Sequence, residues 1–144
     1  MGFAGGQRTL VRMAGDPTAS PKVMETLRKG DVLWGGAVVS GVTKVLHHEV
    51  LQFNRVGFGP LIECTSDQKW SFNKNGKSTL RSYDEGLIDC RVEAFKPPDD
   101  TPIHYDISMI LVRSSTVSYC VSTTNGKPFY VCIAEPSGVW LKAS

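Results

Sequence analysis

Two segments decide the fold prediction: Thr-Leu-Val-Arg-Met-Ala-Gly-Asp at residues 9–16 and Val-Met-Glu-Thr-Leu-Arg-Lys-Gly-Asp-Val-Leu at residues 23–33. In the first segment, the aliphatic and β-branched side chains of residues 9–13 predict a short strand that ends in a tight turn. The second predicts a packed helical turn and then a Gly-Asp turn that starts the next strand. This helix is expected within residues 21–28, with Ser20 as candidate N-cap and Pro21 at its first position.

Strand-forming runs make up most of the remaining chain. They lie at residues 37–46, 50–56, 61–65, 87–92, 107–112, 117–121 and 129–133. The turn-forming pairs Asn75-Gly76 and Asn125-Gly126 lie between runs, residues 97–102 predict a loop, and Gly41 predicts a bulge or bend within its run. Short strands at a spacing of roughly ten residues predict an all-β fold. We expect one domain over residues 1–144, with very little helix.

The composition of the chain excludes several functional classes. Of its 144 residues, 41% are hydrophobic and 21% are charged, which suits a folded domain rather than a disordered chain. The net charge of +2, without a basic run, argues against nucleic-acid binding. No apolar stretch approaches the roughly 18 residues of a membrane helix, and the first residues lack the pattern of a signal peptide. We therefore expect an intracellular monomer that contacts neither nucleic acid nor membrane.

The chain has four widely spaced cysteines, each in an apolar run: Cys64, Cys90, Cys120 and Cys132. Zinc ligands usually occur in close pairs, so this spacing favours free thiols in a reducing compartment over a structural zinc site. His47 and His48 also make a poor metal pair, because adjacent strand residues point to opposite faces of a sheet. We expect neither a metal nor a cofactor.

Residues 3–16 resemble the opening of a Hint domain, the fold shared by inteins and hedgehog autoprocessing domains. In that family a cysteine and a small turn precede Thr-Leu-Val-x-Met-Ala-Asp-Gly, and an Ile-x-x-Leu-x-x-Gly-Asp-x-Val element follows at the spacing of residues 23–33. Residues 61–70 are similar to the Val-x-x-Thr-x-x-His block, and residues 105–107 to the Tyr-Asp-Leu start of a C-terminal block. The resemblance covers residues 2–126 and leaves residues 127–144 unassigned. It implies a flattened, horseshoe-shaped all-β domain whose long bent strands have a pseudo-twofold arrangement.

The resemblance also implies a catalytic site. In active members the first residue is a cysteine or serine that attacks the preceding carbonyl, while the Thr and His of the central block hydrogen-bond the scissile amide and protonate its nitrogen. Here Gly2 occupies the nucleophile position, Thr65 is retained, and Gln68 stands at the histidine position. Glycine has no side chain, and glutamine cannot exchange a proton near neutral pH. We expect Gly2, Thr65, Gln68 and Asn125 to converge on one shallow cleft.

Three later residues complete the candidate site. His104 is either the acid for a C-terminal step or the end of a loop, and Asp106 is a candidate lining residue of the same cleft. The pair Asn125-Gly126 is either a hairpin turn or the asparagine element whose side chain cyclises in inteins. The sequence leaves these alternatives open.

Two functions are consistent with these features. The first is a self-processing domain that acts by splicing or autocleavage on its own flanking segments through an N–S acyl shift, and is inactive or impaired because Gly2 replaces the nucleophile. The second is a non-catalytic β-rich binding or interaction module. Gly2 is either an engineered replacement that traps a precursor-like state or a natural change in a relative that keeps the fold for binding. Gln68 favours natural degeneration or a different arrangement for proton transfer.

Overall fold

A computed structural model describes residues 2–4, 9–15, 20–57, 59–113, 115–133 and 138–144. The elements, in chain order, are β1 (Phe3–Ala4), β2 (Thr9–Val11), β3 (Lys22–Val23), the 3-10 turn η2 (Met24–Thr26), β4 (Val39–His47), β5 (Val50–Arg55), β6 (Gly59–Cys64), β7 (Trp70–Lys74), β8 (Lys77–Arg81), η3 (Tyr83–Glu85), β9 (Cys90–Lys96), β10 (Thr101–Tyr105), β11 (Ile107–Val112), β12 (Thr116–Thr123), η4 (Thr124–Gly126), β13 (Phe129–Ile133) and β14 (Trp140–Ala143). The all-β prediction is confirmed. Within the described residues, no helix is long and apolar enough to span a membrane.

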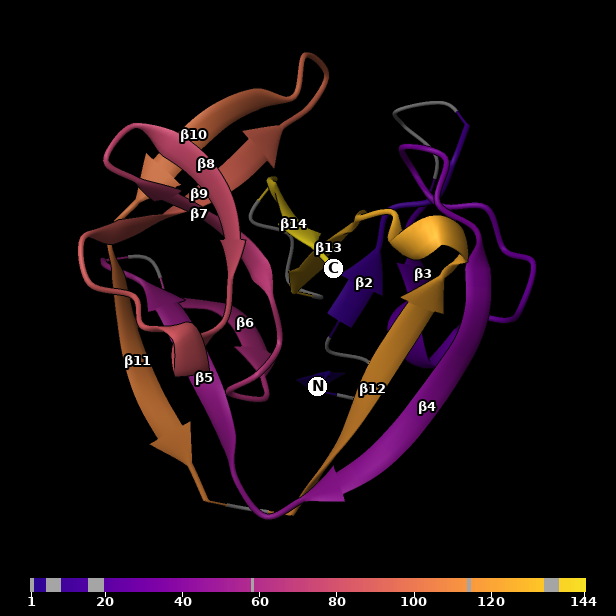
Figure 1. The fold of residues 1–144 in the computed structure, drawn as a ribbon, viewed down its shortest axis with the longest axis horizontal. Coiled ribbons are helices and arrows are strands. Elements are labelled where there is room, and N and C mark those ends of the chain that lie inside the picture. Colours follow the sequence, from indigo (N-terminus) through magenta and orange to yellow (C-terminus); the bar gives the residue numbers. More distant parts are fainter. Residues whose placement is uncertain (1, 5–8, 16–19, 58, 114, 134–137) are drawn as a thin grey trace.

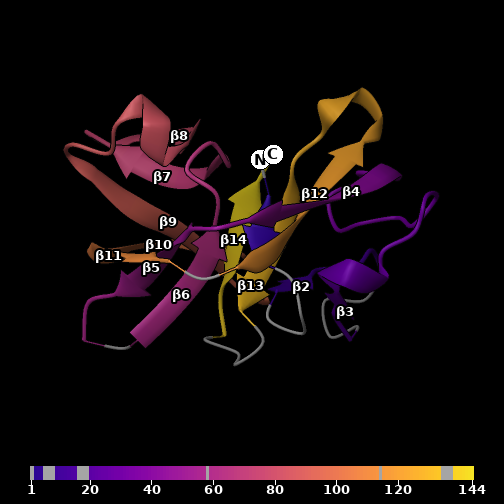
Figure 2. The same cartoon turned by 90° about the horizontal axis from the view of Figure 1, so that it is seen from below.

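The strands form two antiparallel sheets. The first has the order β11-β5-β6-β1-β12-β4, and the second the order β10-β9-β7-β14-β13-β2-β3, with β8 paired to β7. Figure 1 shows the flattened horseshoe outline: β4 and β12 form one arm, β5 and β11 form the other, and the arms meet at the lower edge. Seen from below in Figure 2, β13 and β14 lie in the middle, between the arms.

The first and last strands both occupy interior positions in these sheets. Strand β1 joins the two arms, because Phe3 is paired with Cys64 of β6 on one side and with Tyr119 of β12 on the other. Strand β14 is paired with β13, β7 and β9 in the second sheet. The two ends of the chain therefore complete the sheets instead of lying on their edges.

Local sequence explains two features of the strands. Asn75 and Gly76 both have positive φ angles, 52° and 82°, and connect Lys74 to its partner Lys77 in the β7–β8 hairpin. Asn-Gly is the pair that a two-residue turn of this type favours, since both positions require a left-handed backbone. The bulge predicted near Gly41 is also present, as a register shift in the pairing of β4 with β12 next to Gly41.

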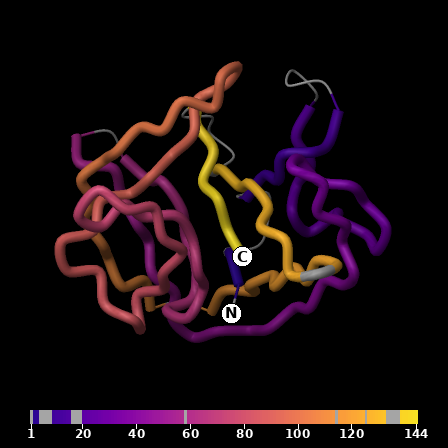
Figure 3. The backbone as a smooth tube through the Cα atoms, turned by 45° about the horizontal axis from the view of Figure 1, so that its top comes forward, coloured from indigo at the N-terminus to yellow at the C-terminus, as the bar shows by residue number. Residues whose placement is uncertain are grey.

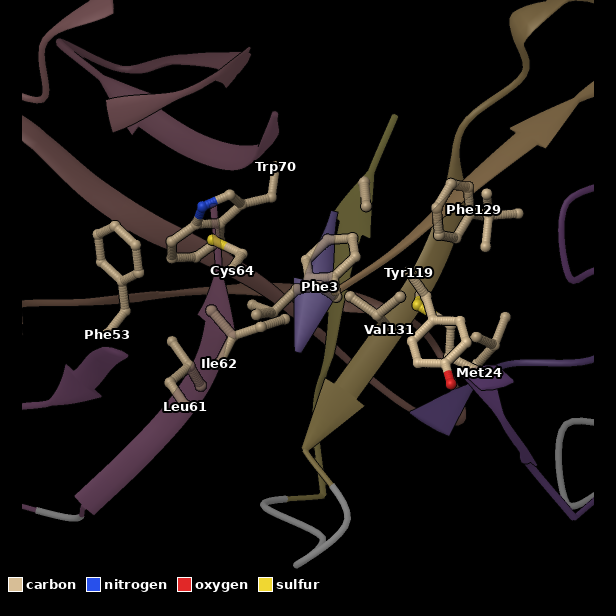
Figure 4. Packing of buried hydrophobic residues seen from close by; sticks show 14 of the residues in the cluster. Phe3, Met24, Phe53, Leu61, Ile62, Cys64, Trp70, Tyr119, Phe129 and Val131 are labelled. Carbon is tan, nitrogen blue, oxygen red and sulfur yellow. The ribbon is translucent and has the colours of Figure 1, made fainter. Parts of the chain in front are cut away.

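The core lies between the two sheets, around Phe3. Figure 4 shows the Phe3 ring with Phe53 and Trp70 on one side and with Tyr119 and Phe129 on the other. The Phe3 and Phe129 rings meet edge to face at 6.5 Å, and the Phe53 and Trp70 rings at 5.0 Å. Burying one such side chain contributes about 1.5–3 kcal/mol to folding, so β1 is held by its phenylalanine as well as by hydrogen bonds.

Several sequence predictions need correction. Residues 97–102 are not all loop, because β10 begins at Thr101; Pro102 is tolerated there since β10 is an edge strand. The helix expected within residues 21–28 is only a 3-10 turn at residues 24–26, with Val23 and not Ser20 at its N-cap. The strand predicted at residues 9–13 is shorter, β2 at Thr9–Val11, and is paired with β13 and β3. Residues 140–143, left unassigned, form β14.

Candidate functional site

The candidate site is built on the turn at residues 65–69, which we call the Thr65 turn. It follows β6 of the first sheet and precedes β7 of the second, so it connects the two sheets. The amide of Gln68 donates to the carbonyl of Thr65 at 3.2 Å and closes the turn. Thr65 and Gln68 are both buried. Because the turn is short and internally hydrogen-bonded, it fixes these two side chains relative to each other.

The Thr65 turn holds the start of the chain. The amide of Thr65 donates to the Gly2 carbonyl oxygen at 2.9 Å. The Thr65 hydroxyl lies 3.4 Å from the same oxygen and 2.6 Å from Oδ1 of Asp67. A hydroxyl has one proton, and the shorter contact to a carboxylate is the stronger hydrogen bond, so this hydroxyl donates to Asp67. The Gly2 carbonyl is therefore held by the backbone amide.

The backbone at Gly2 has a shape that suits glycine. Its φ is +151°, which side chains rarely tolerate, and a β-carbon built there would lie 2.9 Å from the Tyr119 carbonyl oxygen and 3.0 Å from Oγ of Ser118. Contact with a backbone oxygen at that distance requires the chain to move. Absence of the β-carbon at position 2 is thus part of how β1 packs against β12.

The Thr65 turn also holds the end of the chain. Nε2 of Gln68 donates to the Ser144 carbonyl oxygen at 2.9 Å and to the Lys69 carbonyl oxygen at 2.8 Å. The Ser144 amide in turn donates to the Lys69 carbonyl at 3.3 Å, and Ala143 is paired with Trp70. Figure 3 shows the two ends of the chain side by side. Gln68 therefore acts in this structure as an anchor, with its side-chain amide bonded to two carbonyl oxygens.

Sequence reasoning missed Ser144, because residues 127–144 were left unassigned. A signal was present in that segment. Val139, Leu141 and Ala143 are buried, whereas Trp140 and Lys142, which alternate with them, are only half-buried. This period of two is typical of a strand, and it follows Gly138.

His104 and Asp106 have partners outside the Thr65 turn. Nε2 of His104 lies 3.1 Å from Oε2 of Glu93, the residue opposite it on β9. The Asp106 carboxylate accepts a hydrogen bond from Nε of Arg91 at 3.1 Å in an exposed ion pair. The structure thus joins each of these residues to β9 and not to Thr65 or Gln68.

Asn125 lies in η4, beyond the end of β12. The amide of its neighbour Thr124 donates to the Val38 carbonyl oxygen at 2.8 Å. From Tyr119, which faces Gly2, the chain runs five residues along β12 to Thr124, a distance of about 16 Å in an extended strand. The backbone of η4 is thus bonded to the residue before β4, and a place for Asn125 at the Thr65 turn stays a prediction.

The ionisable groups next to Thr65 differ in character. Burial acts to raise the pKa of Asp67, but hydrogen bonds, one of them from the Thr65 hydroxyl, lower the pKa overall, so the side chain is a carboxylate at neutral pH. Burial raises the pKa of the Cys64 thiol far above its ordinary value, and the nearby charge of Asp67 adds to this. Burial also raises the pKa of Cys132 to about 12. Neither thiol is therefore a nucleophile near neutral pH.

In the described part of the chain, no three side chains of His, Cys, Asp or Glu come together as a metal-binding group. The site consists of a backbone amide that holds Gly2, a Thr–Asp hydrogen bond and a glutamine that holds Ser144. Such an arrangement can position peptide groups. It contains no nucleophile at position 2.

Comparison with known proteins identifies the fold. No family model and no curated protein sequence matches the chain. Solved structures do match: a splice-inactive variant of the AceL NrdHF class 3 split intein has a TM-score of 0.70 at 12% identity, over 99% of this chain and 97% of the intein. The TvoVMA intein has a TM-score of 0.66 at 10% identity, over 98% and 97%. A bacterial intein-like domain from Clostridium thermocellum has a TM-score of 0.65 at 12% identity, over 99% and 98%. The chain therefore has the Hint fold of inteins and bacterial intein-like domains.

Proposed function

We propose that this chain is a self-processing domain of the intein type, directed at the peptide bond before Gly2, whose first acyl transfer is lost because position 2 has no nucleophile. The observation that carries the proposal is the Thr65 turn. It bonds the carbonyl of Gly2 through the Thr65 amide and the carbonyl of Ser144 through Gln68. A domain that processes its own flanks needs both ends of its chain at one point, and this turn provides that point.

The step that is lost is a nucleophilic attack on the chain itself. In active relatives the thiol sulfur at the first position attacks the carbonyl carbon of the preceding residue. A carbon–sulfur bond forms, the carbon–nitrogen bond breaks, and the thiol proton ends on the released amine. Gly2 has no atom that can form the new bond, so the flanking peptide bond stays intact in this chain.

The conformation of Gly2 supports natural degeneration over an engineered replacement. An engineered glycine in a domain adapted to cysteine would leave room for a β-carbon at position 2. Here the β-carbon built at Gly2 lies 2.9 Å from the Tyr119 carbonyl oxygen. Gln68 supports the same interpretation, because both of its donor contacts are made to carbonyl oxygens of the turn and the chain end. The partners of the domain are its own flanking segments, and roles in processing for His104, Asp106 and Asn125 stay predictions.

The test restores the nucleophile. A short peptide is fused ahead of Gly2, and four chains are compared: the parent, Gly2→Cys, Gly2→Ala, and Gly2→Cys combined with Gln68→His. The Gly2→Ala chain is the matched control, because it carries the same β-carbon without a thiol. Dithiothreitol should release the peptide from Gly2→Cys as the thioester exchanges, and the added histidine should increase the rate by on the order of a hundredfold. The readouts are a gel and the mass of the released peptide.

Each outcome of this experiment is informative. No release of the peptide from the double variant, with β structure intact by circular dichroism, would contradict the proposal. The result would favour the alternative function, a non-catalytic binding module. Release from the parent or from Gly2→Ala would show that position 2 is not the nucleophile position. Release from Gly2→Cys that Gln68→His does not change would assign proton transfer to another residue.

A further inference from the structure

A cavity with a volume of about 600 Å³ begins at the Thr65 turn. It lies between this turn, η3 and the strands β5 and β11. A volume of this size is typical of sites that take a small molecule or a few side chains of a peptide. We call it the Thr65 cavity.

One wall of the Thr65 cavity is apolar and open to solvent. Met109 and Leu111 of β11 line it, together with Leu51 of the paired strand β5. Met109 and Leu111 are 38% and 41% exposed, and they are two residues apart, so they lie on the same face of β11. Adjacent large apolar side chains exposed to water mark a binding surface, because covering them with an apolar group lowers the free energy.

The rest of the lining is acidic. Glu49, Asp67 and Asp84 line the cavity, and of the described residues around it none is lysine or arginine. The hydrogen bond from Thr65 helps to keep Asp67 ionised. His47 also lines the cavity, and its Nε2 is buried without a hydrogen-bond partner. Buried polar nitrogens normally have a partner, so the lining favours a ligand that brings positive charge and a polar group.

The cavity is continuous with the site already described. Thr65 lines the cavity and also donates its amide to the Gly2 carbonyl oxygen. A polypeptide segment that precedes Gly2 therefore starts at a residue that is hydrogen-bonded to the cavity lining. Extended chain advances about 3.3 Å per residue, so two or three residues before Gly2 are enough to cross it.

We propose that the Thr65 cavity recognises the flanking segment before Gly2, and that it selects a segment with a large apolar side chain next to a lysine or arginine. The apolar side chain covers Met109 and Leu111, and the cation lies among Glu49, Asp67 and Asp84. This inference rests on the proposed function for the existence of the flank. It adds the chemistry of that flank, which neither the fold nor the motif spacing specifies.

The test uses the chain with Gly2 unchanged, so that no cleavage is required. Three short extensions are placed directly before Gly2, ending in Leu-Lys, Ser-Lys or Leu-Glu. The readouts are the thermal midpoint and the NMR chemical shifts of the Thr65, Asp67 and Leu111 amides. The Leu-Lys extension should raise the midpoint by about 2–4 °C over the other two and shift these amides, as expected for a modest binding gain in a domain of this size.

Matched variants assign the effect to the cavity. Met109→Ser should abolish the advantage of leucine, whereas Ile110→Ser should not, because Ile110 is 53% exposed on the same strand but does not line the cavity. Glu49→Gln should reduce the advantage of lysine over glutamate, whereas Asp89→Asn, an exposed carboxylate outside the lining, should not. High salt should weaken the lysine preference and spare the leucine preference.

The outcomes separate this inference from the proposed function. Equal midpoints and unshifted amides for all three extensions would overturn the cavity assignment, even if the Gly2→Cys chain is cleaved. A further outcome is that the Leu-Lys extension gives the higher midpoint while the Gly2→Cys, Gln68→His variant releases no peptide. That pair of results would support the cavity assignment and contradict the self-processing function. If the same Leu-Lys peptide binds only when added as a separate molecule, the cavity recognises an independent partner and the assignment to the flank is wrong.

Discussion

The predicted site residues from the first half of the chain lie together in the structure, whereas His104 and Asp106 from the second half have partners elsewhere. Gly2, Thr65 and Gln68 meet at the Thr65 turn, linked by hydrogen bonds. His104 and Asp106 are bonded to residues of β9. The difference lies in what fixes each position. Thr65 and Gln68 belong to one five-residue turn, whereas His104 belongs to β10 and Asp106 follows that strand.

The largest effect should come from the glutamine that holds both the turn and the chain end. Gln68→Leu removes hydrogen bonds to the Lys69 and Ser144 carbonyl oxygens at a position that is 3% exposed. We expect a loss of about 3 kcal/mol in the free energy of unfolding, because two hydrogen bonds made by a buried side chain are lost. Urea denaturation of purified protein measures it.

The matched control for this change is Asp106→Asn. The Asp106–Arg91 ion pair is exposed, with side chains 76% and 53% accessible, so its loss should cost no more than about 0.5 kcal/mol. Equal losses of unfolding free energy for Gln68→Leu and Asp106→Asn would contradict this contrast. The hydrogen bonds at the Thr65 turn would then stabilise the fold no more than the exposed ion pair of Asp106 does.

A smaller effect is expected at Gly2. Gly2→Ala places a β-carbon 2.9 Å from the Tyr119 carbonyl oxygen at a φ of +151°, so β1 must shift and Phe3 loses part of its packing. The loss should be about 2 kcal/mol. Gly15→Ala is the control, since Gly15 also has a positive φ of +115° but has no atom within 4 Å of the added carbon. Backbone strain alone should cost it about 1 kcal/mol. A smaller loss at Gly2 than at Gly15 would remove the steric argument.

Particular residues show why part of the fold could be predicted and part could not. The hairpin at Asn75-Gly76 and the bulge near Gly41 follow from backbone preferences of a few residues, and both are present. The pairing of β1 with β6 and β12 depends on contacts across 60 residues or more, such as Phe3 with Cys64 and with Tyr119. Periodicity does not encode such pairings, so the order of the strands in the two sheets could not be predicted from it.

The candidate site divides in the same way. Thr65 and Gln68 were found because the spacing within one turn is itself the motif. Ser144 was missed because its partner, the Gln68 side chain, lies 76 residues away. A three-residue likeness such as Tyr105-Asp106-Ile107 carries too little information to place a residue in a site, and Asp106 is paired with Arg91.

A third variant asks whether His104 contributes to chemistry. His104→Ala removes the contact between Nε2 and Oε2 of Glu93 at 3.1 Å, while Oε2 keeps the hydrogen bond from Ser78 at 2.9 Å. We expect a loss of about 1 kcal/mol because one of two partners of a buried carboxylate is lost. In the Gly2→Cys background the rate of thiol-dependent release, corrected for the folded fraction, should not change. A large fall in that rate with stability retained would return His104 to the site.

The smallest effect concerns Asp31, which lies in the Gly-Asp turn of the opening motif and tests whether that motif acts only locally. Its Oδ2 accepts the Arg28 amide at 2.9 Å and Nζ of Lys22 at 3.0 Å. The backbone hydrogen bond from Arg28, and then the bond to Lys22, lower the pKa of Asp31 below its ordinary 3.8. A carboxyl with a lowered folded pKa stabilises the protein above its unfolded pKa and loses this contribution as the pH falls through the folded value.

Asp31→Asn should therefore cost less than about 1 kcal/mol at pH 7, as for a partly exposed ion pair and turn cap. The difference from the parent should shrink steadily below pH 4 and vanish once the Asp31 carboxyl of the folded parent is protonated. Urea denaturation of both chains at pH 7, 4 and 3 measures it, with Asp89→Asn as an exposed carboxyl control. A cost that stays constant with pH would mean that Asp31 acts through its shape and not its charge. A loss of unfolding free energy as large as that of Gln68→Leu would mean that the Gly-Asp turn also supports the candidate site. The contrast between this local turn and the Thr65 turn, which binds both chain ends, would then be wrong.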